Sequence, residues 1–287
     1  MLLTVFTPTY NRAELLGRLY RSLCEQRFTD FEWVIVDDGS TDGTASVVQQ
    51  FIGERRLSIK YLSQANGGKH RAINHGVRQA SGELFFIVDS DDSLAPDALQ
   101  TVADEWAKVG DPAVGGVAGL DATPEGQTIG GDLPTDAIEC NAIDIRNVHH
   151  VTGDLAEVFR TEVLREFPFP EIDGERFCPE ALVWNRIAQR YKLRYFNKVI
   201  YIAEYQPGGL TDRIVRIRMQ SPIASTMCYA ELLAYDIPAK GKVKAAINYW
   251  RFRLCCKSFS KVPKLPTAWN VLMPLGWLMH LRDLRLS

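Results

Sequence analysis

The chain has 287 residues, of which 46% are hydrophobic and 24% charged, enough to bury a substantial core in one large domain or one domain with an appendage. Its six cysteines are scattered and form no C-x-x-C pair, which fits a reducing, cytoplasmic location better than a disulfide scaffold. The net charge of −2 is uneven, because residues 213–287 carry 13 Lys and Arg against 3 Asp and Glu, a net of +10. A basic tail on an acidic body predicts that the two parts face different partners.

Neither end of the chain predicts a membrane-spanning segment. Met1 leads straight into an apolar stretch with no basic leader, so no signal peptide is expected. The longest apolar stretch, residues 268–281, is interrupted and is shorter than the about 20 residues that a transmembrane helix needs.

Strands and helices are expected to alternate through the first hundred or so residues. Apolar runs predict four buried strands, at residues 2–7, 33–36, 57–62 and 84–88. Asn11 with Glu14 predicts a capping box on the first helix. Thr41 or Asp42 is expected to cap the second helix, and Pro96 to open the fourth. The alternation predicts an α/β domain with a mainly parallel sheet and helices on both faces.

Four polar segments follow these strands or the turns after them. They are residues 7–11, 37–40, 66–71 and 89–92. In open α/β sheets a ligand binds outside the carboxyl ends of the strands, so these segments are expected to line one edge. Their convergence predicts a ligand site there.

Beyond about residue 111 the pattern loosens. We expect a strand at 113–120, a loop at 121–136, a helix at 177–189, a hairpin from 193–196 and 199–203, and helices from 214 onward. His149 and His150 would point to opposite faces of a strand, so they are poor joint metal ligands. They are expected to pack or to contact an acceptor.

Asp89-Ser90-Asp91-Asp92 places three carboxylates at a strand end. Like charges this close repel one another, and a divalent cation removes that cost. Mg²⁺ and Mn²⁺ prefer oxygen ligands and often bind one or two carboxylates together with substrate phosphates. The alternative is an acidic helix N-terminus, with Asp92 or Ser93 as a cap.

Two further segments of this edge suit a nucleoside diphosphate. In residues 37–40 (Asp-Asp-Gly-Ser) an Asp can accept from a base N–H or a ribose hydroxyl, although Asp and Gly are also ordinary turn residues. Residues 66–71 (Asn-Gly-Gly-Lys-His-Arg) offer backbone N–H groups and two cations at a helix start, which suits a diphosphate. Neither G-x-x-x-x-G-K-[ST] nor a G-x-G-x-x-G after the first strand is present, so a Walker loop or a dinucleotide is not expected.

The four segments together resemble the family 2 glycosyltransferases of GT-A fold. The resemblance rests on Thr7-Pro8-Thr9-Tyr10-Asn11-Arg12, Val36-Asp37-Asp38-Gly39-Ser40-Thr41-Asp42, Asn66-Gly67-Gly68 with Ala72 and Asn74, and Asp89-Ser90-Asp91-Asp92. Order and spacing match over roughly the first third of the chain. The resemblance implies a Rossmann-like mixed sheet flanked by helices and an inverting transfer from a nucleotide-sugar, commonly a UDP-sugar, with Mn²⁺ or Mg²⁺.

The resemblance also implies roles for single residues. Residues 8–12 and Asp38 would line the nucleoside pocket, Asp89 would face the ribose, and Asp91 would hold the metal and act in catalysis. The residues expected to bind the nucleotide-sugar are Thr7, Pro8, Thr9, Tyr10, Asn11, Arg12, Asp37, Asp38, Gly68, Lys69, Arg71, Asp89 and Ser90.

In this family a carboxylate near the start of a later helix serves as general base. Glu180 is the best match, although the usual acidic pair is reduced here to one Glu, and Asp173 and Glu175 are rivals. An inverting displacement needs one base to deprotonate the acceptor hydroxyl, and a metal neutralises the leaving diphosphate. A first-turn carboxylate that only favours the helix dipole is the structural alternative for Glu180.

The basic tail is rich in aromatic and aliphatic residues. Its members include Arg213, Arg216, Arg218, Lys240, Lys242, Lys244, Tyr249, Trp250, Phe252, Trp269, Leu272, Met273, Leu275, Trp277, Leu278 and Met279. Such a pattern suits a helix that lies at the inner face of a membrane. It equally suits a helical subdomain packed on the catalytic core or on a second subunit in a homodimer. No nucleic-acid module is recognisable, so nucleic acid is not an expected partner.

We therefore predict a GT-A catalytic domain at residues 1–212, with a nucleotide-sugar half at 1–92 and an acceptor half at 93–212, followed by a helical region at 213–287. The predicted acceptor is a glycan or a lipid-linked glycan in polysaccharide biosynthesis. Two alternatives stay open, a nucleotide-binding protein without turnover and a sugar nucleotidyltransferase. The second is disfavoured because its glycine-rich loop would occupy residues 7–11. Paired carboxylates also allow a glycosidase, but adjacent carboxylates at one strand end suit a metal better.

Overall fold

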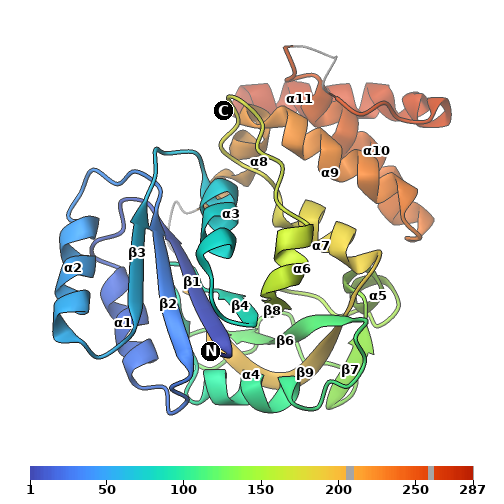
Figure 1. The fold of residues 1–287 in the computed structure, drawn as a ribbon. Coiled ribbons are helices and arrows are strands. Elements are labelled where there is room, and N and C mark those ends of the chain that lie inside the picture. Colours follow the sequence, from blue (N-terminus) through green and yellow to red (C-terminus); the bar gives the residue numbers. More distant parts are fainter. Residues whose placement is uncertain (205–209, 258–261, 287) are drawn as a thin grey trace. The chain divides into compact units, whose positions relative to one another are not determined.

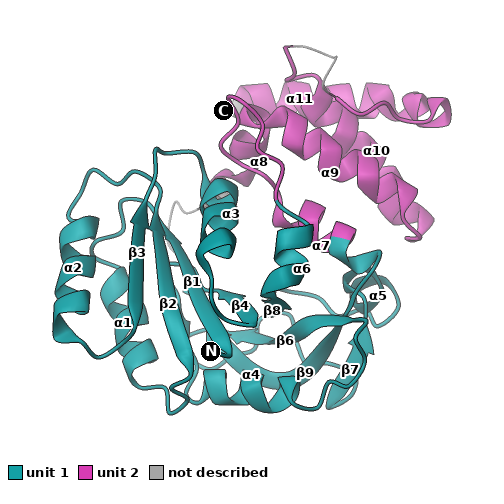
Figure 2. Ribbon diagram, viewed as in Figure 1, with its two compact units in different colours: residues 1–168, 187–206 teal, residues 169–186, 207–287 magenta. Residues whose placement is uncertain are grey.

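The computed structural model describes residues 1–204, 210–257 and 262–286. The chain divides into two compact units (Figure 2). Unit 1 comprises Met1–Pro168 and Ile187–Gln206, and unit 2 comprises Phe169–Arg186 and Pro207–Ser287. Unit 2 thus joins the C-terminal region to a segment that interrupts unit 1 in sequence. The division of function among residues 1–92, 93–212 and 213–287 stays a prediction.

The strands described form one nine-stranded sheet in unit 1 (Figure 1). They are β1 (Leu3–Thr9), β2 (Phe31–Asp37), β3 (Ile59–Ser63), β4 (Leu84–Ile87), β5 (Ser93–Leu94), β6 (Val114–Ala122), β7 (Ala137–Cys140), β8 (Leu155–Arg160) and β9 (Lys192–Ile202). Their order is β3-β2-β1-β4-β8-β6-β9-β5, with β7 paired to β9. The first four strands pair in parallel, whereas β8 runs antiparallel to β4 and β6. This mixed sheet confirms the predicted fold class.

Helices cover both faces of the sheet (Figure 1). The helices described in the two units together are α1 (Leu16–Cys24), α2 (Thr44–Glu54), α3 (Lys69–Gln79), α4 (Ala98–Trp106), α5 (Ala142–Asn147), α6 (Thr161–Glu166), α7 (Glu180–Ala188), α8 (Leu210–Gln220), α9 (Pro222–Ala234), α10 (Ala239–Arg253), η1 (Thr267–Leu272) and α11 (Met273–Leu286). α1, α2 and α4 share one apolar core with the sheet. On the opposite face α3 approaches β1 so closely that a Cβ at Gly76 would meet the Phe6 ring at 2.1 Å.

The apolar spacing predicted for α1 accounts for its position. Leu16, Leu19 and Leu23 are all buried in the core against β1 and β2. Each contributes about 1.5–3 kcal/mol when it leaves water. Tyr20, on the same helix, stacks on Phe51 of α2 with ring centroids 4.0 Å apart. The polar segments that follow β1 and β2 therefore extend from a rigid base.

Two helix starts differ from the sequence prediction. α1 begins only at Leu16 and has no side-chain cap. Asn11 instead adopts a left-handed conformation with φ 52°, and its Oδ1 accepts a hydrogen bond from Thr41 N at 2.8 Å. α2 follows Gly43, although Asp42 Oδ1 accepts from Thr44 N at 3.0 Å. Asn11 joins the ends of β1 and β2 rather than capping a helix.

The predicted hairpin near residue 197 is wrong. Residues 192–202 form the single strand β9, which pairs in parallel with β6. Asn197 and Lys198 resemble a turn in sequence, but they lie within the strand, where the pairing with β6 shifts register between Ala118 and Leu120. Such bulges accommodate residues that interrupt the alternating pattern. The neighbouring strands β7 and β8 were not expected from the sequence.

Unit 2 is largely helical, which confirms the predicted C-terminal helical extension. α10 packs against α9, and it packs against α11 so closely that a Cβ at Gly276 would meet Trp250 Cβ at 2.4 Å. Arg251 and Asp283 form a buried bidentate ion pair, with Nη2 donating to Oδ1 at 2.8 Å. Within the described ranges, none of the helices is apolar over enough residues to cross a bilayer.

Candidate active site

The carboxyl ends of β1, β2 and β4 lie side by side. β1 and β2 are in register up to the pair Thr9 and Asp37, and β1 also pairs with β4. Beyond the paired residues, Asp38 N–H donates to the Thr9 carbonyl at 2.8 Å and Val88 N–H donates to the Phe6 carbonyl at 2.8 Å. The segments that follow these strands are therefore neighbours, as the parallel order requires.

Asp38 at the end of β2 is buried and holds the turn before α3. Its Oδ1 accepts from Gly67 N–H at 2.8 Å and from Gln64 Nε2 at 2.8 Å, and its Oδ2 accepts from Gly68 N–H at 2.7 Å. The Gly68 backbone has φ 97°, a conformation that glycine adopts without strain. The backbone N–H groups that the sequence offered to a diphosphate thus already donate to a carboxylate.

Asp37 is also buried and fully engaged. Its Oδ1 accepts from Ser40 N–H at 2.7 Å and its Oδ2 from the Tyr61 hydroxyl at 2.6 Å. Burial, followed by the bond to Asp37, raises the pKa of Tyr61, so this phenol stays protonated as a donor. Asp37 therefore shapes the turn at residues 38–40.

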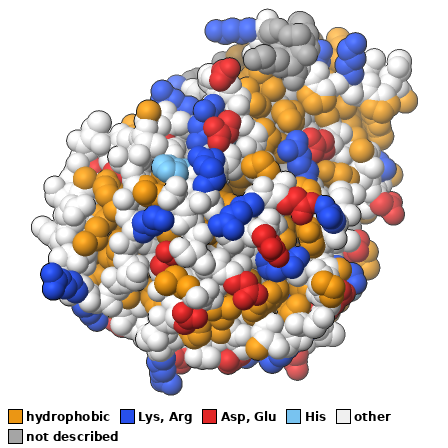
Figure 3. All heavy atoms as spheres, in the orientation of Figure 1, with side chains coloured by type: hydrophobic (Ala, Val, Ile, Leu, Met, Phe, Trp, Pro, Cys, Tyr) orange, Lys and Arg blue, Asp and Glu red, His pale blue; other side chains and the backbone are white. Residues whose placement is uncertain are grey.

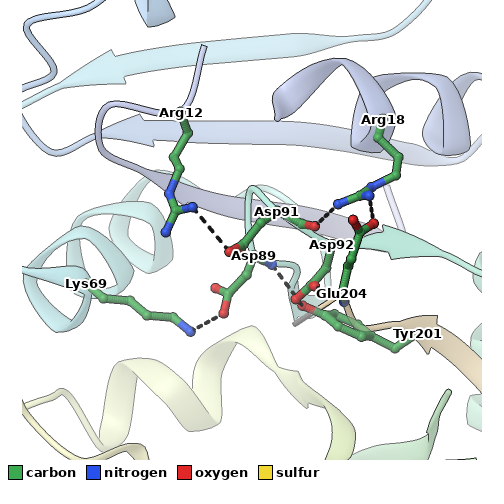
Figure 4. Close-up of polar contacts among 8 residues, drawn as sticks. All are labelled: Arg12, Arg18, Lys69, Asp89, Asp91, Asp92, Tyr201 and Glu204. Atoms are coloured by element: carbon green, nitrogen blue, oxygen red, sulfur yellow. Dashed lines mark hydrogen bonds and ion pairs between the residues drawn. The ribbon is translucent and has the colours of Figure 1, made fainter. Parts of the chain in front are cut away.

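The segment after β1 carries Arg12 toward β4. Asn11 N–H donates to Ser40 Oγ at 2.8 Å, and Arg12 N–H donates to Thr44 Oγ1 at 3.1 Å. These bonds fix the backbone, and the Arg12 side chain reaches Asp91, with Nη1 3.4 Å from Oδ2 (Figure 4). That separation is longer than the about 2.7–2.9 Å of a hydrogen-bonded ion pair. Arg12 is held close to the carboxylate without saturating it.

Other predicted residues of this segment lie deeper or farther out. Thr7 is fully buried and its Oγ1 accepts from Trp33 Nε1 at 2.9 Å. Thr9 Oγ1 is buried without a hydrogen-bond partner in the part of the chain that is described. Pro8 is buried, whereas Tyr10 is exposed. A contact of each with a nucleotide stays a prediction.

Asp89 and Asp91 face cations from separate elements (Figure 4). Lys69, at the start of α3, donates its Nζ to Asp89 Oδ2 at 2.7 Å. Arg18 of α1 bonds to the Asp91 carbonyl oxygen and forms an ion pair with Glu204. The Asp91 carboxylate lies at the surface with 23% of the side chain exposed. Positive side chains from three elements thus meet at the acidic end of β4.

Asp92 turns inward and is bound by β9. Its Oδ2 accepts from the Tyr201 hydroxyl at 2.5 Å, and its Oδ1 accepts from Glu204 N–H at 2.8 Å. Burial raises the pKa of Asp92 to about 7, and the charges of Asp89 and Asp91 add to this, while the Tyr201 bond opposes it. Asp92 therefore anchors the loop that presents Asp91.

The remaining predicted residues of this edge lie near the same loops. Ser90, which lies between Asp89 and Asp91 in the sequence, is buried. Arg71 is half-buried on the first turn of α3 and packs near Gly67, whose added Cβ would meet Arg71 Cδ at 2.5 Å. Gly68 and Lys69 stand at the start of the same helix. The structure thus brings the predicted residues of unit 1 to one region.

The carboxylates at the end of β4 fit a cation that is shared with a ligand. Over the described part of the chain, no three Asp, Glu, His or Cys side chains gather as a complete metal site. Mg²⁺ and Mn²⁺ commonly take one or two protein carboxylates and complete their shell with phosphate oxygens and water. The partly exposed Asp91 carboxylate suits that arrangement, because Arg12, its ion-pair partner among the described residues, is 3.4 Å away.

The candidate general bases lie in unit 2. Glu180 opens α7 and is half-buried. Glu175 is buried, and its two carboxylate oxygens accept from Ile223 N–H at 2.6 Å and Ala224 N–H at 2.8 Å, in the first turn of α9. Asp173 is exposed. Glu175 therefore has a structural role that leaves it poorly suited to proton transfer. For Glu180 and Asp173 the role of general base stays a prediction.

Sequence patterns did not reveal several residues that organise this site. Tyr201 contacts Asp92 across 109 residues of sequence, and Gln64 contacts Asp38 across 26. Arg18 and Glu204 pair across a similarly long separation. None lies in a motif, because their roles arise only when β9, the β3 end and α1 meet the acidic loops.

Comparison with known sequences identifies the family. The family described as "Glycosyl transferase family 2" matches residues 4–156, more than half of the chain. The chain belongs to glycosyltransferase family 2. The match spans β1 to β8 and includes all four polar segments, so the resemblance seen in the sequence is confirmed.

Curated relatives resemble this glycosyltransferase over a limited part of their length. The poly(ribitol-phosphate) beta-N-acetylglucosaminyltransferase TarS of Staphylococcus aureus is 37% identical over 105 residues, 36% of this chain and 18% of that protein. A chondroitin synthase of Escherichia coli is 36% identical over 107 residues, 37% of this chain and 16% of that protein. The chain thus spans less than a fifth of either relative.

Solved structures share the fold over nearly the whole chain. TarS residues 1–349 in complex with UDP superimpose with a TM-score of 0.65 at 21% identity, covering 99% of this chain and 88% of that one. A mannosyltransferase from Pyrobaculum calidifontis in complex with GDP-Man and Mn²⁺ gives a TM-score of 0.59 at 20% identity, covering 98% and 86%. At these identities the likeness establishes the fold alone.

Proposed function

We propose that this chain transfers a sugar from a nucleoside-diphosphate sugar, with UDP as the expected nucleotide, to a hydroxyl of a glycan or lipid-linked glycan. The observation that carries the proposal is the gathering of Arg12, Lys69 and the Asp89–Asp91 carboxylates at the carboxyl edge of β1, β2 and β4. Family membership supports it, as do the UDP and GDP-Man complexes of structures with the same fold.

The charges at this edge suit a diphosphate. Arg12 and Lys69 are half-buried cations paired with Asp91 and Asp89, so each can exchange its carboxylate for a phosphate oxygen. Asp91 would hold a Mn²⁺ or Mg²⁺ ion. Such an ion, when bound, supplies positive charge that stabilises the leaving diphosphate. Asp38 and Asp37 keep the turns beside it in shape for the nucleoside.

Glu180 is the proposed general base. Its carboxylate would take the proton of the acceptor hydroxyl while that oxygen forms a bond to the anomeric carbon. The bond from the anomeric carbon to the diphosphate oxygen breaks, its electron pair leaves with the nucleoside diphosphate, and the configuration inverts. Changing Glu180 to Gln should abolish transfer while donor binding persists, and Asp173→Asn should leave transfer unchanged. Transfer retained in Glu180→Gln would refute the assignment.

Isothermal titration tests the donor site directly. UDP and GDP are titrated into the wild-type protein, Asp91→Ala and Asp104→Ala, with Mn²⁺ and with EDTA. Asp104 is an exposed carboxylate of α4 and serves as the matched control. Metal-dependent binding that only Asp91→Ala loses is the expected result. Binding of neither nucleotide by the wild-type protein would refute the donor site.

Turnover separates this proposal from its alternatives. A nucleotide-binding protein without turnover would bind UDP and release none from any UDP-sugar. A sugar nucleotidyltransferase would make pyrophosphate from UTP and a sugar phosphate. The proposed enzyme instead releases UDP from a UDP-sugar when an acceptor is added.

We further infer that η1 and α11 of unit 2 contact an anionic membrane surface. Val271, Leu275, Trp277 and Leu278 are exposed, the last two by 48% and 55%. From residue 237 to 287 the sequence holds ten Lys and Arg and one acidic residue, Asp283, which is buried against Arg251. The exposed charges described there are all positive. Apolar side chains beside basic ones are typical of interfacial helices. A cytoplasmic location stays a prediction.

Vesicle flotation tests this contact. The protein should float with vesicles of phosphatidylglycerol and phosphatidylcholine and remain unbound with phosphatidylcholine alone. The double variant Trp277→Ser with Leu278→Ser should lose flotation, whereas Val243→Ser, an exposed apolar residue of α10, should keep it. If the wild type does not float but sediments as a dimer, and the double variant sediments as a monomer, this surface would be assigned to a second subunit.

Figure 3 shows that basic and acidic side chains are interspersed over the drawn face of unit 1.

A further inference from the structure

One buried carboxylate of unit 1, among the described residues, lacks a hydrogen bond to one of its oxygens. Asp121 lies near the carboxyl end of β6, is 6% exposed, and its Oδ1 is enclosed with no hydrogen-bond partner in the described residues. A buried polar atom left without a hydrogen bond destabilises the folded state. Such groups are rare in native structures, and each one asks for a reason.

The other buried carboxylates of the chain show what is missing. Those in the described residues are Glu32, Asp37, Asp38, Glu105, Glu175 and Asp283. Each of these binds backbone N–H groups, hydroxyls or cations that the fold supplies. Asp121, in contrast, is held through its backbone, since its carbonyl oxygen accepts from Ile129 N–H at 2.8 Å, while its Oδ1 has no partner in the described part of the chain. The backbone is therefore anchored while the carboxylate is left for another partner.

Asp121 lies near the acidic edge described above. Asp121 is the register partner of Tyr201 in the parallel pairing of β6 with β9, directly after a register shift. The Tyr201 hydroxyl donates to Asp92, so Asp121 lies beside the residue that binds the acidic loop after β4. The charge of Asp92 is among the causes that raise the pKa of Asp121, after burial and Asp154.

The charges around Asp121 restrict what it can bind. Asp154 and Asp92 are acidic, and Arg146 is the cation that opposes them. A phosphate or carboxylate ligand would add repulsion here. A neutral hydroxyl group, in contrast, can donate to the carboxylate and adds no charge.

We propose that Asp121 accepts a hydrogen bond from a sugar hydroxyl and so helps to determine which sugar the enzyme uses. The inference rests on the proposed glycosyl transfer and deepens it. The hydroxyl belongs either to the sugar of the donor or to the sugar of the acceptor. Both sources present the same chemistry to the carboxylate, and the experiment distinguishes them.

The first measurement is the stability of Asp121→Leu. If the carboxylate serves a ligand and not the fold, replacing it with an apolar side chain of similar size should raise the melting temperature. Asp104→Asn, which changes an exposed carboxylate of α4, is the control and should leave the melting temperature unchanged. A lower melting temperature in Asp121→Leu would show a structural role and overturn the proposal.

The second measurement is binding and transfer by the same variants. UDP and four UDP-sugars (glucose, galactose and their N-acetylamino forms) are titrated into each protein, and transfer to nitrophenyl glycosides is followed. Asp121→Leu should bind UDP as the wild type does. If Asp121 contacts the donor, the affinity of Asp121→Leu for the UDP-sugar should be about tenfold lower, because the sugar hydroxyl loses its acceptor. If Asp121 contacts the acceptor, the KM for the glycoside should instead be about tenfold higher.

The outcomes separate this inference from the proposed function. A wild-type protein that binds neither UDP nor any UDP-sugar overturns both. A wild type that binds and transfers, together with an Asp121→Leu variant that does so equally well, overturns the role of Asp121 alone.

Discussion

The ends of β2 and β4 carry nearly the same sequence signal and use it differently. At β2, the Asp38 carboxylate accepts hydrogen bonds from Gly67 N–H, Gly68 N–H and Gln64 Nε2, each at 2.8 Å or less. At β4, the Asp91 carboxylate lies 3.4 Å from the Arg12 guanidinium and stays partly exposed, while Arg18 bonds to the Asp91 carbonyl oxygen. The carboxylate at the end of β2 is bonded within the fold, whereas those at the end of β4 are paired with cationic side chains that a ligand can displace.

This difference teaches that an acidic turn after a strand does not by itself identify a ligand site. What separates the two is the nature of the donor. Backbone N–H groups cannot leave without unfolding the turn, whereas an Arg or Lys side chain can rotate away at a cost of about 1 kcal/mol or less. Variants at the two ends should therefore separate activity from stability.

The largest expected effect is the loss of activity in Asp91→Ala. If Asp91 holds the cation at the diphosphate, its removal should lower kcat by about 10²–10³-fold, as for loss of other transition-state charge contacts. UDP release from a UDP-sugar measures this. The melting temperature should hardly change, because the carboxylate receives only a distant ion pair. A destabilised Asp91→Ala would contradict the comparison.

The next effect is the destabilisation of Asp38→Ala. Its removal leaves two backbone N–H groups and the Gln64 amide without an acceptor in a buried place. The free energy of unfolding should fall by about 2–4 kcal/mol, since bonds to a charged acceptor are among the stronger ones. Urea titration measures this change. Asp104→Ala, on the surface of α4, should remain within about 0.5 kcal/mol of the wild type.

How far the sequence reached can be judged from the same residues. It placed β1, β2, β4 and α3, because their apolar runs and spacing are local properties. It could not show that Asp38 binds Gly68, which lies 30 residues away, or that Tyr201 reaches Asp92. Asn197 was read as a turn because polar residues inside an irregular strand look the same in sequence. Contacts between distant segments decide these points.

A further effect is expected in the pH dependence of stability around Asp121. The pKa of this carboxyl is raised from 3.8 to about 7, chiefly by burial. Between these values the folded protein keeps a proton that the unfolded chain has lost, so the free energy of unfolding falls as pH rises and is constant above about 7. The Asp121→Asn variant has no such carboxyl, so its free energy of unfolding should not show this decrease. Its melting temperature relative to the wild type should therefore rise across that window.

Asp92 has a similar shift and is present in both proteins, so most of its own titration cancels in the difference between the two melting curves. A difference that does not vary with pH would show that Asp121 titrates normally.

The smallest effect on stability is expected for Lys69→Met. Lys69 and Asp89 are partly exposed, so their ion pair should contribute about 0.5 kcal/mol or less to folding. The affinity for UDP should nevertheless fall several-fold, since a cation beside the diphosphate is lost. Arg78→Met, a solvent-exposed cation at the other end of α3, is the control. Equal UDP affinity in both variants would remove Lys69 from the site.

The turn that Asp38 holds has a consequence for the speed of binding. Residues 66–68 are already ordered by bonds to the end of β2, so the loss of chain entropy, roughly 1–2 kcal/mol per residue, falls on folding and not on ligand capture. A nucleotide that meets this edge need not wait for the turn to form. Its association rate should follow encounter and electrostatic steering, and so decrease with salt, while rearrangement of residues 66–68 adds no slow phase.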